Sequence, residues 1–149
     1  MLDRATFLVP VAHRGLHAAA KGVIENTAPA FEAALALGLG IECDLQPAAD
    51  GTPMVFHDVA LDRLVDAPGA VADHDPAALV RWRYRGDPTA SILCLADLLD
   101  LVGGRVPLLI EVKSEWDPPH AGFLDAIARD LRTYRGPAAV MSFDPSVIA

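Results

Sequence analysis

Hydrophobic and polar positions along this chain switch between strand-like and helix-like spacing. Short apolar or alternating runs predict four strands, at residues 7–13, 40–46, 106–113 and 138–142. Apolar stripes at helical spacing predict helices at residues 28–37, 76–82, 95–102 and 121–134, the last preceded by a loop containing Pro118 and Pro119. This order of elements is typical of an α/β fold with a parallel sheet, formed by one continuous unit.

A hairpin is predicted after the second strand. Asp50–Gly51 is a strong turn signal, and residues 53–58 (PMVFHD) are interpreted as the return strand. A two-residue turn at this point would place Asp44 directly opposite His57, with both side chains on the same face.

Polar side chains stand at the carboxyl end of every predicted strand. They are His13 and Arg14, Glu42 and Asp44, Glu111 and Lys113, and Ser142. In α/β sheets and barrels the carboxyl ends of the strands hold the active site, so we expect these side chains to converge. Asn26 and Thr27 are interpreted as caps of the first helix, and Cys43 as a core residue because it alternates with its acidic neighbours.

The composition excludes several classes of function. The 149 residues are 52% hydrophobic and 21% charged, which is enough for a buried core, and the net charge of −8 argues against a nucleic-acid or anionic membrane surface. Cys43 and Cys94 lack the C-x-x-C spacing of a zinc ribbon or a redox dithiol. The amino terminus is a poor signal peptide and no apolar run is long enough to span a bilayer, so we expect a cytoplasmic protein without stable membrane insertion.

Three of the strand-end residues are carboxylates. Glu42, Asp44 and Glu111 would repel one another at neutral pH if nothing neutralised them. A divalent cation with oxygen ligands is one solution, and ion pairs with Lys113 and Arg14 are the other; residue type alone does not decide between them.

Two histidines stand at the ends of predicted strands beside these carboxylates. His13 and His57 could divide the roles of general base and general acid, since imidazoles titrate near neutrality. Arg14 and Lys113 could hold an anionic phosphate, the guanidinium as a fork and the ammonium as a point charge. Together with a cation, this set of side chains fits phosphodiester cleavage.

The series of motifs resembles the glycerophosphodiester phosphodiesterase family from about residue 9 to residue 144. The matching pieces are His13-Arg14-Gly15, Glu25-Asn26-Thr27, Glu42-x-Asp44, Asp50-Gly51 followed by His57-Asp58, Glu111-x-Lys113 and Ser142-Phe143-Asp144. Each piece alone is weak, but their order and spacing together are specific. The resemblance implies a TIM-barrel fold and hydrolysis of a small-molecule glycerophosphodiester to glycerol 3-phosphate and an alcohol.

The resemblance also implies a role for each residue. It assigns Glu42, Asp44 and Glu111 to a bound Mg2+ or Ca2+, His13 and His57 to acid–base catalysis through a cyclic phosphate, and Arg14 and Lys113 to the substrate phosphate. The alternatives are a phospholipase-type phosphodiesterase that acts on lipids, and a non-catalytic half-barrel that binds its ligand only after association.

The length bears on the domain organisation. A TIM barrel typically needs about 250 residues. We therefore expect residues 1–149 to form a single domain that corresponds to the first half of the barrel, C-terminally incomplete, with four parallel strands and an insertion at about 59–94. We expect an open pocket of this kind to be weakly active alone, and a homo-oligomer to be one way of covering the open sheet edges.

Overall fold

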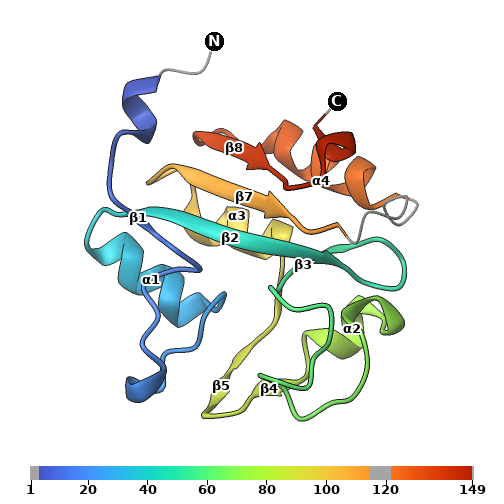
Figure 1. The fold of residues 1–149 in the computed structure, drawn as a ribbon. Coiled ribbons are helices and arrows are strands. Elements are labelled where there is room, and N and C mark those ends of the chain that lie inside the picture. The colour runs from blue at the N-terminus through green and yellow to red at the C-terminus, as the bar shows by residue number, and fades with distance from the viewer. Residues whose placement is uncertain (1–3, 115–121, 149) are drawn as a thin grey trace.

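The computed structural model describes residues 4–114 and 122–148. Its main sheet contains β1 (Val11–Ala12), β2 (Gly40–Pro47), β3 (Pro53–Val55), β6 (Leu93–Cys94), β7 (Leu108–Val112) and β8 (Ala138–Met141). Strands β1, β2, β7 and β8 run parallel in that spatial order, whereas β3 runs antiparallel to both of its neighbours, β2 and β6 (Figure 1). The expected α/β fold with four parallel strands is therefore confirmed as a partial barrel, whose sheet is not closed within the described residues.

Strands β1 and β3 lie on the same edge of β2. Ile41 of β2 pairs with β1 on one side and with β7 on the other. Further along β2, Leu45 pairs with β3 on the side of β1 and with β7 on the opposite side. β1 and β3 are therefore separated by residues 42–44 of β2. The chain leaves β1 at this gap, so the segment after β1 is placed beside two of the predicted site residues.

Helices pack against the sheet and an insertion extends from it. The α-helices are α1 (Ala28–Ala36), α2 (Pro76–Leu79), α3 (Leu95–Val102) and α4 (Phe123–Thr133). The 3-10 helices are Arg4–Phe7, Ala19–Lys21, Val71–Asp73 and Pro145–Val147, and the second sheet pairs β4 (Arg83–Tyr84) with β5 (Asp87–Ser91).

Two hydrophobic cores support this arrangement. The first joins α1, α3 and α4 to the parallel strands, with Phe31, Leu98 and Ile110 fully buried. The second lies under the insertion, where Leu61, Val65 and other apolar side chains pack against β3. Figure 1 shows the insertion, with α2, β4 and β5, beside β3 and on the opposite side of the sheet from β8. Cys43 is completely buried, as predicted for a core residue.

The prediction of a first strand at residues 7–13 is wrong over most of that range. Residues 4–7 form a 3-10 helix and only Val11–Ala12 pair with β2. Pro10 has no N–H to donate to a ladder, and its carbonyl instead accepts from the Gly40 amide at 2.9 Å.

The predicted register of the hairpin is also wrong, by one residue. Leu45 pairs with Val55 and Pro47 with Pro53, so the amide that donates to the Asp44 carbonyl is that of Phe56, not His57. Two prolines opposite one another cannot exchange ladder hydrogen bonds. The chain therefore turns through the longer connection 48–52, in which the Ala48 amide donates to the Thr52 carbonyl.

The helix predictions agree better with the structure. The helix at 95–102 has the predicted bounds, and α1 begins directly after Thr27. α2 is shorter than predicted, and the Pro118–Pro119 loop lies outside the described residues. No helix among the described residues is long and apolar enough to cross a membrane. The covering of the sheet edges by a second copy stays a prediction.

Candidate functional site

The three predicted carboxylates meet on the central strands. Glu42 and Asp44 project from β2, and Glu111 projects from β7, where it is the register partner of Asp44. One ligand atom from each residue lies within 4.8 Å of the others, and all three residues are buried. The alternation of a strand explains the geometry, since residues two apart share a face and the parallel ladder brings the third carboxylate alongside.

Glu42 has the least compensated charge of the three. Its Oε1 atom is buried and accepts no hydrogen bond from the described residues. Burial, followed by the neighbouring charge of Asp44, raises the pKa of the Glu42 carboxyl to about 7. A buried carboxylate oxygen without a donor, in a cluster of oxygen ligands, fits a divalent cation, so Glu42, Asp44 and Glu111 could hold one.

Basic side chains neutralise part of the same cluster. Lys113 Nζ lies 2.6 Å from Glu111 Oε1 and 3.0 Å from Asp44 Oδ1, while Arg14 Nε lies 3.2 Å from Asp44 Oδ2. Asp44 Oδ1 and Arg14 Nε nevertheless lack hydrogen-bond geometry, so these two contacts are electrostatic. The sequence alone did not decide whether a cation or ion pairs neutralise the three carboxylates. In the structure, Asp44 and Glu111 form ion pairs with basic side chains. Among the described residues, no lysine or arginine forms an ion pair with Glu42.

The segment that follows β1 wraps around this cluster in a left-handed conformation. Arg14 has a φ of 57° and its backbone N–H donates to Glu42 Oε2 at 2.9 Å. Gly15 has a φ of 76°, and a Cβ at that position would lie 2.8 Å from the Ala30 carbonyl carbon. Only glycine fits there, which explains the residue order His-Arg-Gly at the end of β1.

Asn26 belongs to the site and does not cap the helix. Its Nδ2 donates to Asp44 Oδ2 at 2.9 Å, its Oδ1 accepts from the Asp44 amide at 3.4 Å, and its own amide donates to the Arg14 carbonyl. Thr27 occupies the N-cap position, but its Oγ1 donates to the Ile24 carbonyl at 2.6 Å. The pair predicted as caps therefore fixes the loop, and Asn26 fixes the orientation of one acidic side chain.

The two histidines lie in different environments. The side chain of His13 is 68% exposed, and its Nε2 is 3.8 Å from Glu42 Oε2. His57 is partly buried beyond the end of β3, where its carbonyl accepts from Gln46 Nε2 at 2.9 Å and its Nδ1 lies 2.7 Å from Asp58 Oδ1. His13 is therefore in direct contact with the acidic cluster, whereas His57 is held by its own neighbour in the sequence.

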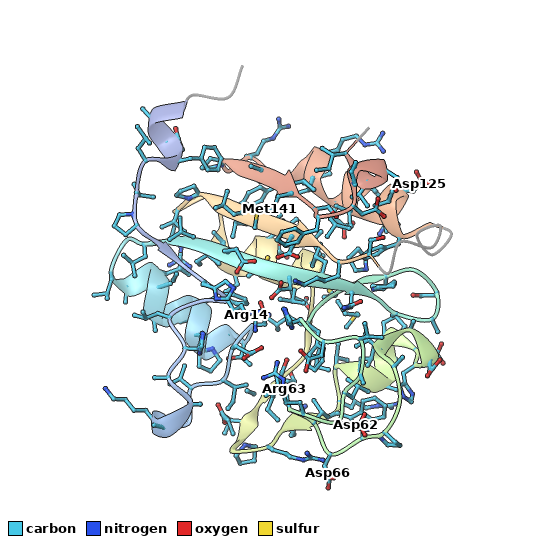
Figure 2. The ribbon with its side chains drawn as sticks, viewed as in Figure 1. Arg14, Asp62, Arg63, Asp66, Asp125 and Met141 are labelled. Atoms are coloured by element: carbon cyan, nitrogen blue, oxygen red, sulfur yellow. The ribbon has the colours of Figure 1, made fainter. Side chains whose placement is uncertain are left out.

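Two residues without a predicted role connect these parts. Glu25 Oε1 accepts from Arg14 NH1 at 3.0 Å and from Arg63 NH2 at 2.7 Å. Arg63 also donates to both carboxylate oxygens of Asp58. Figure 2 shows Arg14 and Arg63 between β2 and the β4–β5 hairpin. Glu25 and Asp58 belong to the motifs described in the sequence analysis, but no periodic pattern in the sequence pointed to Arg63.

A small cavity opens beside the cluster. It measures about 190 Å³ and is lined by Glu111, Met141, Ser142 and Phe143. Ser142 Oγ donates to the Val112 carbonyl at 2.8 Å, so this hydroxyl supports the end of β8. The cavity leaves room beside one of the acidic ligands for part of a small molecule.

Comparison with known sequences identifies related proteins. The model of the Glycerophosphoryl diester phosphodiesterase family matches residues 13–148. A glycerophosphodiester phosphodiesterase of Caldanaerobacter subterraneus subsp. tengcongensis is 35% identical over 114 residues, which cover 70% of this chain and 44% of that protein. The chain thus spans less than half the length of this curated relative.

Solved structures with the same fold extend the comparison. A glycerophosphodiester phosphodiesterase from Agrobacterium tumefaciens superposes with a TM-score of 0.76 at 28% identity, covering 93% of this chain and 59% of that one. A phosphodiesterase of Oleispira antarctica, in complex with the product sn-glycerol-3-phosphate, superposes with a TM-score of 0.78 at 24% identity, covering 94% and 60%. The partial barrel therefore has the architecture of part of these larger structures.

Proposed function

The chain belongs to the glycerophosphoryl diester phosphodiesterase family, and we propose that it hydrolyses glycerophosphodiesters to glycerol 3-phosphate and an alcohol. The observation that carries the proposal is the buried carboxylate cluster, in which Glu42 Oε1 accepts no hydrogen bond from the described residues. A histidine and two basic side chains contact this cluster. These are the groups that cleavage of an anionic diester requires.

The carboxylates are proposed to hold the cation, Mg2+ or Ca2+. Glu42, Asp44 and Glu111 supply hard oxygen ligands, which both ions prefer. When bound, the cation would polarise a phosphate oxygen and offset the negative charge that develops on it. Asn26 holds Asp44 through the Nδ2 hydrogen bond, so this ligand is oriented before the cation arrives.

The phosphate is proposed to contact Arg14 and Lys113. Both side chains are about one-fifth exposed and both are tied to Asp44 within 3.2 Å. Burial works to lower the pKa of Lys113, but the hydrogen bond to Glu111 and the ion pair with Asp44 more than offset it, so the pKa is raised and the amine stays protonated. The cluster therefore presents two fixed positive charges at its edge, where an anionic substrate would be attracted.

The histidines are proposed to move the protons. In the first step the 2-hydroxyl of the glycerol attacks phosphorus, and one of His13 and His57 accepts its proton. The P–O bond to the alcohol breaks, and the other imidazole donates a proton to the departing oxygen. Water then opens the cyclic phosphate with the two roles reversed, which yields glycerol 3-phosphate and restores both histidines.

The position of bond cleavage tests this function. We expect the protein to convert glycerophosphocholine to glycerol 3-phosphate and choline, followed by ³¹P NMR and by an enzymatic assay for glycerol 3-phosphate. Vesicles of phosphatidylcholine serve as the second substrate, because a phospholipase-type enzyme would act on them. Release of phosphocholine, or turnover of the vesicles alone, would refute the proposal.

Cation affinity should depend on pH through Glu42. The pKa of this carboxyl, raised to about 7 by burial and by Asp44, means that a proton must leave before the oxygen can bind a cation. Affinity should therefore rise about tenfold per pH unit from pH 5 to pH 7 and then level off. Calorimetric titration with Mg2+ and Ca2+ at pH 5.5, 6.5 and 7.5 measures this, and an affinity that stays constant across the three values would exclude Glu42 as the titrating ligand.

A further inference from the structure

A tight turn in the insertion presents Arg63. The Leu64 and Val65 amides both donate to the Leu61 carbonyl, at 3.1 and 2.9 Å. Leu61 and Val65 are fully buried in the second core, whereas the Arg63 side chain between them is 47% exposed. Leu61 and Val65 therefore anchor the turn in the second core, and the Arg63 side chain extends away from that core.

The turn is also fixed from both flanks. The Leu61 amide donates to the Gly69 carbonyl at 3.0 Å, and the Arg85 amide donates to the Leu64 carbonyl at 2.8 Å. Val65 forms an isolated bridge with the buried Tyr84 of β4. Because backbone bonds and core packing hold the turn, its position does not depend on the contacts of the arginine side chain.

The guanidinium of Arg63 joins two carboxylates. Its Nε donates to Asp58 Oδ2 at 2.6 Å and its NH2 to Asp58 Oδ1 at 3.1 Å. On its other side, NH1 and NH2 donate to Glu25 Oε2 and Oε1 at 3.2 and 2.7 Å. A planar fork with five donors can make both bidentate contacts at once, and a lysine ammonium cannot.

Asp58 in turn determines the tautomer of His57. The hydrogen bonds from Arg63 lower the pKa of the Asp58 carboxyl to about 2, so it is ionised at neutral pH. An ionised carboxylate only accepts hydrogen bonds, so the nitrogen 2.7 Å away, Nδ1 of His57, must be the donor. The neutral imidazole then carries its lone pair on Nε2, which is the atom left to exchange a proton with a substrate.

We propose that Arg63 is a positioning residue for His57, which it orients through Asp58 from the rigid turn of the insertion. The proposal rests on the proposed function in so far as His57 belongs to the acid–base pair. It gives the insertion a role in the site, because the second core fixes the arginine and the arginine fixes the carboxylate. Glu25 extends the same chain of ion pairs to Arg14 and so to the acidic cluster.

The test compares Arg63→Gln, Arg63→Lys and a matched control in the 149-residue chain. The control is Arg129→Gln, which removes an exposed arginine that pairs with Asp130 on α4 at 3.1 Å. Circular dichroism checks that each variant folds. Long-range ¹H–¹⁵N NMR of the imidazole then reports the tautomer of His57, a readout that needs neither substrate nor cation.

We expect neutral His57 to carry its proton on Nδ1 in the wild type and in Arg129→Gln. In Arg63→Gln the Nε2–H tautomer should become populated, because Asp58 is no longer held in place. Arg63→Lys should give an intermediate population, and it also carries the test if the glutamine variant folds poorly. A tautomer unchanged in both Arg63 variants, or a lysine variant identical to wild type, would overturn the proposal.

Kinetics provide the second readout. With glycerophosphocholine as substrate, Arg63→Gln should lower kcat by about ten- to a hundredfold and change KM less than about threefold, because the arginine does not touch the substrate. A rise in KM at constant kcat would contradict a positioning role. If no variant and no wild-type protein releases glycerol 3-phosphate, the proposed function fails, and the tautomer measurement still decides the role of Arg63.

Discussion

Replacement of His57 by alanine is expected to lower kcat for glycerophosphocholine by at least about a hundredfold, since general acid–base catalysis contributes factors of this size. His57 lies outside the carboxylate cluster, so cation affinity measured by calorimetry should stay within about threefold of wild type. The expected signature is thus a loss of turnover without a loss of cation binding.

His74 provides the matched control for this variant. It belongs to the insertion, where its Nε2 contacts the Pro68 carbonyl and its ring packs edge-on against Trp82. His74→Ala should therefore keep its activity. Equal activity in His57→Ala and His74→Ala would remove His57 from the mechanism, and a parallel loss of cation binding in His57→Ala would mean that the histidine supports the cluster instead.

Replacement of Glu42 by glutamine should have two effects of opposite sign. Cation affinity should fall by at least about a hundredfold, because the cluster loses a charged oxygen ligand. The cation-free protein should become more stable above pH 7, by up to about 3 kcal/mol. The sign follows from the pKa of Glu42, which burial and Asp44 raise to about 7 from the ordinary value of 4.5. Between these two values the unfolded chain ionises first, so ionisation favours unfolding.

Calorimetric titration and thermal unfolding at pH 8 without added cation measure the two effects. Glu32→Gln is the control, since it removes an exposed carboxylate from α1 and should change neither quantity. Destabilisation of the cation-free protein by Glu42→Gln, or retained cation affinity, would show that Glu42 is satisfied by other contacts.

The acidic cluster was predictable because it follows from strand geometry. Glu42 and Asp44 are two residues apart on one strand, and the parallel order of β2 and β7 brings Glu111 beside Asp44. Two central strands and the alternation of their side chains were sufficient for this prediction. No exact loop conformation was needed.

The parts that were not predictable depend on tertiary contacts or on loop conformation. The hairpin register failed because Pro47 and Pro53 stand opposite each other and force a longer turn than Asp50–Gly51 suggests. Asn26 resembled a helix cap, but the loop brings its side chain to Asp44. Arg63 was missed because the turn that carries it is shaped by the second core, which no local periodicity reveals.

The central claim is that the carboxylate cluster and the histidines of this chain together cleave a glycerophosphodiester. The most direct measurement is release of glycerol 3-phosphate from glycerophosphocholine by the 149-residue protein, first after chelation and then after addition of Mg2+ or Ca2+, with His13→Ala measured in parallel. We predict slow release that requires the cation and is lost in His13→Ala. Release that persists with the chelator or in His13→Ala would contradict the claim, as would cation binding without any release, which is the behaviour of a binding module.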